Sequence, residues 1–188
     1  MTFETLISIC LGVGLAASVG FRVFLPLFAL SLASYFDVWQ LNESWQWIGS
    51  TAALVTLGVA TLAEVFAYFI PYIDNLLDGI AVPLAALAGT AIMLSTVADL
   101  SPAITWALAV IAGGGTAAAV AGTSSTARLA STATTGGIAN PLVSTAETGT
   151  SVLISVVSIF LPVVGFVLVI ILLFVIFRLY KKFKTSNV

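Results

Sequence analysis

Apolar side chains dominate five long stretches of the chain, which polar residues separate only briefly. A helix needs about 18–20 consecutive apolar residues to cross roughly 30 Å of hydrocarbon. The pattern therefore predicts an all-α fold, a polytopic helical membrane protein with about five to six transmembrane or half-membrane helices. The stretches are residues 4–36, 50–71, 79–98, 103–131 and 150–178.

Two of these stretches contain residues that interrupt helices. The first is too long for one straight span and contains Gly20 and Pro26. We expect a break or a strong kink there, because proline removes a backbone hydrogen bond and clashes with the preceding turn. Pro162 predicts a bend in the last stretch for the same reason.

Composition agrees with a membrane location. Hydrophobic residues make up 60% and charged residues 7% of the chain, and the mean hydropathy is +1.17, whereas soluble domains carry about 25% charged residues. We expect one integral, multi-pass membrane domain over residues 1–188. Basic residues near the end predict that residues 179–188 form a cytoplasmic tail; they are Arg178, Lys181, Lys182 and Lys184.

The chain lacks the side chains that most often carry enzyme or metal chemistry. It has no histidine and a single cysteine, Cys10, which removes the commonest general base and any cysteine metal cluster. No membrane lysine lies beside a serine. We therefore expect no enzyme activity, no metal and no cofactor.

A few charged residues fall inside or beside the apolar stretches. Such a charge costs about 2.5–3.5 kcal/mol at the bilayer centre and usually faces a partner or a wet cavity. Asp74 and Asp78 follow a proline and precede a glycine, so they are either interfacial helix-end residues or part of a site. For Asp99 we expect a helix cap. The remaining charges are Arg22, Glu64, Arg128 and Glu147.

Hydroxyl side chains recur at helical spacing around these charges. Residues three, four or seven positions apart share one helix face, and Tyr68 follows Glu64 by four positions. Around Arg128 the face holds Ser124, Ser125, Ser131, Thr132 and Thr135, and around Glu147 it holds Ser144, Ser151, Ser155 and Ser158.

Three interpretations of the small, polar residues 121–137 stay open. Small and hydroxyl residues pack helices closely, which would make Arg128 and Glu147 a buried salt bridge. Alternatively the segment is a flexible linker centred on "TTGGIANP", residues 134–141, which has the composition of a turn. The third interpretation is a polar path through the membrane, lined by residues 123–135.

Two short segments hint at a duplication. "GVGLAAS", residues 12–18, resembles "GGGTAAA", residues 113–119, and each precedes an arginine and then a membrane glutamate. Repeats of inverted topology with broken helices that meet near the midplane show such an order. The repeat halves would be residues 1–99 and 100–178.

The chain also resembles a known family. "AASVGFRVFLPLFALSLA" (16–33), "LAEVFAYFIPYIDNLLD" (62–78) and "STAET" (144–148) are similar to segments of a widespread family of small bacterial polytopic membrane proteins catalogued as a domain of unknown function. Its marks include Gly20–Arg22 with Pro26, and Glu64 with Pro71 and Asp74. Phe69 stands where the family often has a basic residue. The resemblance implies the fold and a location in the bacterial inner membrane but no established activity.

Together these features predict a membrane transporter or channel for a small solute, with an anion as the candidate solute. Arg22 and Arg128 would face the anion, and Glu64 and Glu147 would be counter-charges or proton carriers. The alternatives are a translocase for a lipid or lipid carrier and a non-transporting structural or assembly subunit. We expect a small-molecule or ion substrate, membrane lipids as partners, no nucleic acid and a possible homo-oligomer. The other candidate site residues are Tyr68, Asp74, Asp78, Ser124, Ser125, Ser131 and Thr132.

Overall fold

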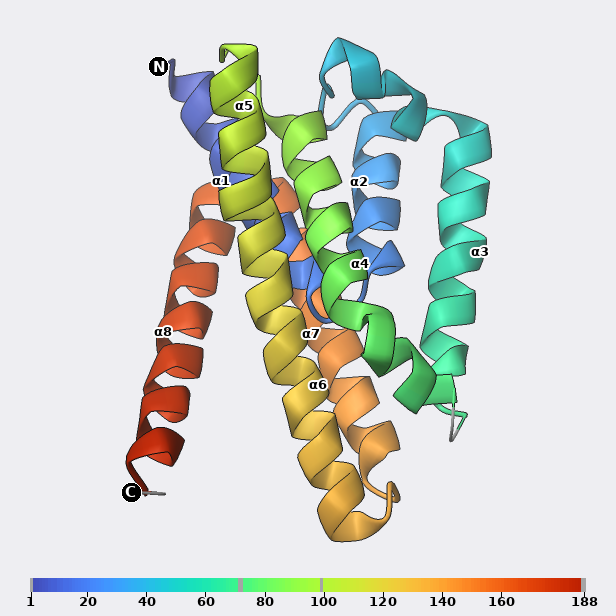
Figure 1. Ribbon diagram of the computed structural model, residues 1–188. Helices are drawn as coiled ribbons and strands as arrows, with labels where there is room; N and C mark the ends of the chain where they lie inside the picture. Colours follow the sequence, from blue (N-terminus) through green and yellow to red (C-terminus); the bar gives the residue numbers. More distant parts are fainter. Residues whose placement is uncertain (1, 71–72, 99, 187–188) are drawn as a thin grey trace.

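The computed structural model describes residues 2–70, 73–98 and 100–186. Within these ranges the regular structure is helical throughout (Figure 1), as the apolar pattern predicts. Pro71 and Asp99 lie outside the described residues. The elements are α1 (Phe3–Val19), α2 (Phe24–Tyr35), η1 (Glu43–Gly49), α3 (Thr51–Ala67), α4 (Ile73–Thr96), α5 (Pro102–Leu108), η2 (Ala109–Gly114), α6 (Gly115–Thr135), α7 (Asn140–Phe160) and α8 (Pro162–Ser186).

The first apolar stretch is broken as expected, and it forms a hairpin. Helix α1 runs inward from the end of the molecule that holds the N-terminus, and α2 returns to that end (Figure 1). The break spans residues 20–23. A side chain at Gly20 would place its Cβ 2.7 Å from the carbonyl oxygen of Ala117, so glycine allows the hairpin tip to pack against α6. Pro26 lies in the first turn of α2, where a missing N–H costs no helical hydrogen bond.

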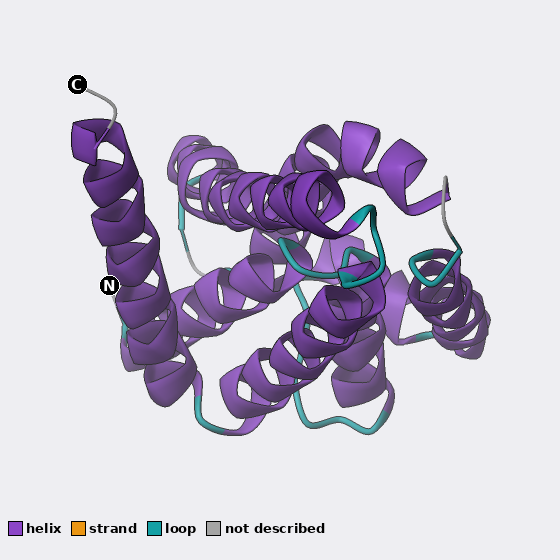
Figure 2. Ribbon diagram, turned by 90° about the horizontal axis from the view of Figure 1, so that it is seen from below, coloured by secondary structure: helices purple, strands orange, loops and turns teal. Residues whose placement is uncertain are grey.

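The last apolar stretch reverses direction at Pro162 instead of bending. Helix α7 ends at Phe160, and α8 begins at Pro162 and runs back toward the end that holds the C-terminus (Figure 1). The two hairpins, α1–α2 and α7–α8, therefore open toward opposite ends of the molecule. The view along the bundle places α8 at one edge (Figure 2).

Residues 102–135 form one continuous helical rod through α5, η2 and α6. The linker interpretation of residues 121–137 is therefore wrong, and only the turn that it included is confirmed, at Gly136 and Gly137, which have φ of 63° and 88°. The wider turn of η2 brings Gly113 against α4, where an added Cβ would lie 2.5 Å from the carbonyl oxygen of Gly89.

In the part of the chain that the structure describes, three helices are long and apolar enough to cross a membrane: Ile73–Thr96, Pro102–Thr135 and Asn140–Phe160. A fourth candidate is η1 with α3, which meet at 64°. Helices α1, α2 and the first part of α8 are apolar but shorter. The structure begins α4 at Ile73, six residues before the expected start, so Asp74 and Asp78 lie within a helix.

Helix α1 occupies the centre of the bundle. Its residues from Cys10 to Val19 are all buried, and it packs against α4, α7 and α8. Two apolar clusters meet along it, one with α2 and α4 and the other with α4, α6 and α8. The central helix therefore ends, at the Gly20 break, deep inside the protein.

Candidate functional site

Arg22 lies at the tip of the α1–α2 hairpin and is 1% exposed. A guanidinium has five N–H groups, and all five are used. Nε donates to Thr148 Oγ1 (3.0 Å), Nη1 to the Phe21 carbonyl (2.9 Å) and to Glu147 Oε2 (3.2 Å), and Nη2 to the carbonyl and the hydroxyl of Ser144 (2.9 and 2.6 Å). Arg22 therefore joins the hairpin tip firmly to α7.

Glu147 of α7 binds both arginines. Its carboxylate accepts from Arg22, from Arg128 of α6 through Nε (3.3 Å) and Nη2, and from the hydroxyl of Ser124. Arg128 is 2% exposed, and its Nη1 is buried without a hydrogen-bond partner. The second arginine thus keeps unused N–H donors.

Asp78 of α4 completes this group, with its Oδ1 3.7 Å from Arg128 Nε. We call Arg22, Arg128, Asp78 and Glu147 the charge centre. Two guanidinium and two carboxylate groups give it a formal charge of zero, which is how buried charges are tolerated. Three charges expected at one site, Arg22, Arg128 and Glu147, are therefore brought together.

Tyr68, which follows the end of α3, covers the charge centre. The guanidinium carbons of Arg22 and Arg128 lie 4.2 and 4.0 Å from the centre of its ring, within the range of cation–π attraction. The side chain is buried. One aromatic ring therefore contacts both cations.

Glu64 of α3 makes its hydrogen bonds to the start of α2. Its carboxylate accepts hydrogen bonds from the backbone N–H groups of Val23 (2.7 Å) and Phe24 (2.9 Å), which begin α2 and have no side-chain cap of their own. Among the described residues, no ion pair joins Glu64 to either arginine. Glu64 thus caps the N-terminus of a half-helix, where a carboxylate is favoured by the helix dipole.

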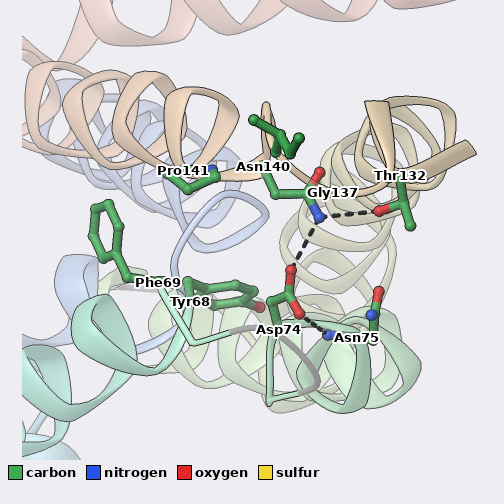
Figure 3. Close-up of a pocket in the computed structure, with 10 residues that line it drawn as sticks. Tyr68, Phe69, Asp74, Asn75, Thr132, Gly137, Asn140 and Pro141 are labelled. Carbon is green, nitrogen blue, oxygen red and sulfur yellow. Dashed lines mark hydrogen bonds between the residues drawn. The ribbon is translucent and has the colours of Figure 1, made fainter. Parts of the chain in front are cut away.

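A second polar group lies at the end of the bundle that holds the α6–α7 turn. Asn140 Nδ2 donates to Asp74 Oδ2 and to Thr132 Oγ1, both at 3.0 Å (Figure 3), while Asn140 Oδ1 is buried without a partner. These residues line a pocket of about 460 Å³, which we call the polar pocket. Its lining also includes Tyr68, Phe69, Asn75, Gly136 and Gly137.

A second cavity, of about 330 Å³, lies between α2, α3 and α4. We call it the lateral groove. Its lining is apolar apart from Glu64 and Tyr68 and includes Phe24, Ala60 and Leu84. Tyr68 lines both cavities, and its ring also contacts both arginines of the charge centre.

The serine stripe of α7 packs against α1. Ser18 Oγ donates to the carbonyl of Ser151 (2.7 Å) and lies 2.7 Å from Ser155 Oγ, and all four stripe serines are fully buried. This stripe is close helix packing, and none of its serines lines the polar pocket or the cavity between α2, α3 and α4. The face around Arg128 is mixed: Ser124 contacts Glu147 and Thr132 lines the polar pocket, whereas Ser125 and Ser131 are half-buried, with Ser131 Oγ unpartnered.

The sequence interpretation missed Asn140 and Thr148. Asn140 belongs to a segment whose composition is typical of a turn. The one signal that could have singled it out is its position directly before Pro141, because proline is common in the first turn of a helix. Thr148 follows Glu147 on a hydroxyl-rich helix, where no spacing rule distinguishes it. Both become visible only when α7 is placed against α4, α6 and the hairpin tip.

These features define an all-helical protein with candidate membrane-spanning helices and a buried charge centre. The chain belongs to the family described as "Domain of unknown function (DUF4126)", whose sequence model matches residues 9–182. The match includes the whole charge centre and confirms the resemblance seen in the sequence. No curated protein and no solved structure matches the chain.

Proposed function

We propose that this protein is a membrane transporter for a small solute with an anionic group, and that Arg128 is the group that binds the anion. The observation that carries the proposal is the unpartnered Nη1 of Arg128, in a charge centre covered by Tyr68, which also lines the polar pocket. A purely structural ion pair is expected to satisfy its buried donors. Glu147 would be the counter-charge that neutralises Arg128 when no solute is bound.

The arrangement of the hairpins supports a transport mechanism. Two hairpins that open toward opposite ends, with one tip beside the charge centre (Figure 1), resemble the broken helices that form binding sites in inverted-repeat transporters. The proposal includes that the two halves of the chain, residues 1–99 and 100–178, are repeats of inverted topology. The two halves differ at one place, because Arg22 lies at a helix break whereas Arg128 lies within helix α6.

The charge distribution supports an orientation in which the C-terminus is cytoplasmic. The α6–α7 turn lies at the same end as the C-terminus (Figure 1), and its Gly136 and Gly137 line the polar pocket. The pocket would therefore open to the cytoplasm, while the tightly packed α1–α7 serines would close the other side. The described conformation would then be the inward-facing one.

Uptake into proteoliposomes tests the proposal. Flux of a panel of small carboxylates and inorganic phosphate is measured with and without a pH gradient. Hydrogen bonds to charged groups are worth about 1.5–3 kcal/mol, so Arg128→Gln should reduce flux about tenfold or more. Thr126→Ala, on the exposed face of the same helix, is the matched control and should leave flux unchanged. Folded wild-type protein that moves no member of the panel would overturn the proposal.

One observation favours the alternative of a structural or assembly subunit, namely that every N–H of Arg22 is already bonded. The double variant Arg128→Gln with Glu147→Gln separates the two functions. Removing one partner of a buried pair costs about 3–5 kcal/mol, whereas removing both is often neutral. Glu147 also bonds to Arg22, and Asp78 lies beside Arg128, so the double variant leaves one cation and one carboxylate in the charge centre. It should therefore be more stable in thermal unfolding than Arg128→Gln alone and yet inactive in transport. A stable double variant that still transports would remove the charge centre from the mechanism.

A further inference from the structure

The lateral groove opens on the side of the bundle, because α3 packs mainly against α2 and η1 and hardly against α4. The gap between α3 and α4 is lined by small and aliphatic side chains, among them Ala60, Ala63, Leu77 and Ile80. If the helices cross a bilayer, as the proposed function requires, such a gap faces hydrocarbon. A lipid chain then fills it more favourably than water, which finds almost no hydrogen-bond partner there.

The apolar lateral groove and the polar pocket adjoin each other, which suits a ligand with an apolar tail and a polar head. The groove extends along α3 from Ala60 to Tyr68, roughly 12 Å at about 1.5 Å per residue. At Tyr68 it meets the polar pocket, which lies where α3 ends and α4 begins. An apolar chain directed toward the bilayer interior and a polar head at the helix ends is the normal orientation of a lipid.

The chemistry behind Tyr68 points to a carboxylate head. The Nε and Nη2 of Arg128 already hold the carboxylate of Glu147, while Nη1 remains free. A ligand carboxylate would find at Nη1 the same charge-assisted hydrogen bond. Because the Tyr68 ring covers Arg128 at 4.0 Å, its side chain must swing aside for the head to bind.

We propose, on the basis of the proposed function, that the solute is a single-chain carboxylate with a long alkyl tail. It enters from the bilayer through the side of the bundle, and it binds with its tail in the lateral groove and its carboxylate on Arg128. One narrow groove matches one chain, and one free guanidinium nitrogen matches one small anionic head. The proposal assigns recognition of the tail to α3 and α4 and recognition of the head to α6.

Binding to the full-length protein in nanodiscs tests this inference. The ligands are acetate, octanoate, dodecanoate, dodecanol and dodecyl phosphate. Ala60→Phe fills the groove, Val59→Phe adds the same side chain on the neighbouring exposed face of α3, and Arg128→Gln removes the cation. The double variant with Glu147→Gln replaces Arg128→Gln if the single variant does not fold.

Affinity should rise about tenfold or more from octanoate to dodecanoate, since each buried CH₂ contributes to transfer from water. Ala60→Phe should remove this gain and Val59→Phe should not, and Arg128→Gln should weaken dodecanoate binding to the level of dodecanol. Uptake of acetate in the proteoliposome assay, together with equal affinities for octanoate and dodecanoate, would overturn the inference and leave the proposed function standing. Equal binding of dodecanol and dodecanoate, or tighter binding of dodecyl phosphate, would overturn the assignment of a carboxylate head.

Discussion

Arg22 and Arg128 carry the same charge but have different surroundings. Arg22 holds the hairpin tip through five hydrogen bonds. Arg128 shares the carboxylate of Glu147 with Arg22, and its Nη1 has no hydrogen-bond partner. The residue types alone predicted that these charges need partners. They could not predict which partner, because Arg22 and Glu147 are 125 positions apart, and only the packing of α1 against α7 joins them.

Glu64 provides a test at the scale of one residue. Its carboxylate is the acceptor for the first two N–H groups of α2, and each buried N–H left without an acceptor costs about 1–3 kcal/mol. We expect the melting temperature in mild detergent to fall in the order wild type, Glu64→Gln, Glu64→Ala, because glutamine keeps one acceptor oxygen.

Leu62→Ala, on the exposed face of α3, is the control for this series and should change the melting temperature little. An unchanged melting temperature in Glu64→Ala would mean that the start of α2 does not depend on this carboxylate.

At the scale of elements, the sequence predicted where helices stop better than how they continue. Gly20 and Pro162 marked both interruptions correctly, since glycine and proline act on the local backbone. The reversal at Pro162 was not predictable, because the direction of α8 depends on its packing against α1 and α7. The composition of residues 121–137 likewise fitted a linker as well as a helix. The structure shows that residues up to Thr135 are helical, in a helix that packs against α4.

The contact between α4 and the η2 turn yields a prediction about two glycines. An added Cβ at Gly89 would lie 2.7 Å from the Gly113 carbonyl oxygen, so the helices must separate, and overpacking of this kind costs about 1–3 kcal/mol. Gly115, in the same region, has open space around it. Gly89→Ala should lower the melting temperature by about 2–4 °C per kcal/mol, and Gly115→Ala should raise it slightly. Equal effects of the two substitutions would contradict a close Gly89–Gly113 contact.

At the scale of the whole molecule, the two ends differ in charge. The end with the N-terminus also holds the segment between α2 and α3, with Asp37 and Glu43, while the other end holds the α6–α7 turn and the end of α8 (Figure 1). Arg178 and Lys181 are exposed near the end of α8, whereas the side chains of Lys182 and Lys184 lie outside the described part of the chain.

This asymmetry predicts the orientation in the membrane. In a Cys10→Ser background, Ile138→Cys, which replaces a side chain 86% exposed in the α6–α7 turn, should react with an impermeant maleimide only in inverted vesicles. Val38→Cys, at the opposite end, should react only from outside, because cytoplasmic loops collect lysine and arginine. The reverse pattern would place the polar pocket outside the cell. A carboxylate would then enter the lateral groove from the outer half of the bilayer, and the described conformation would be the outward-facing one.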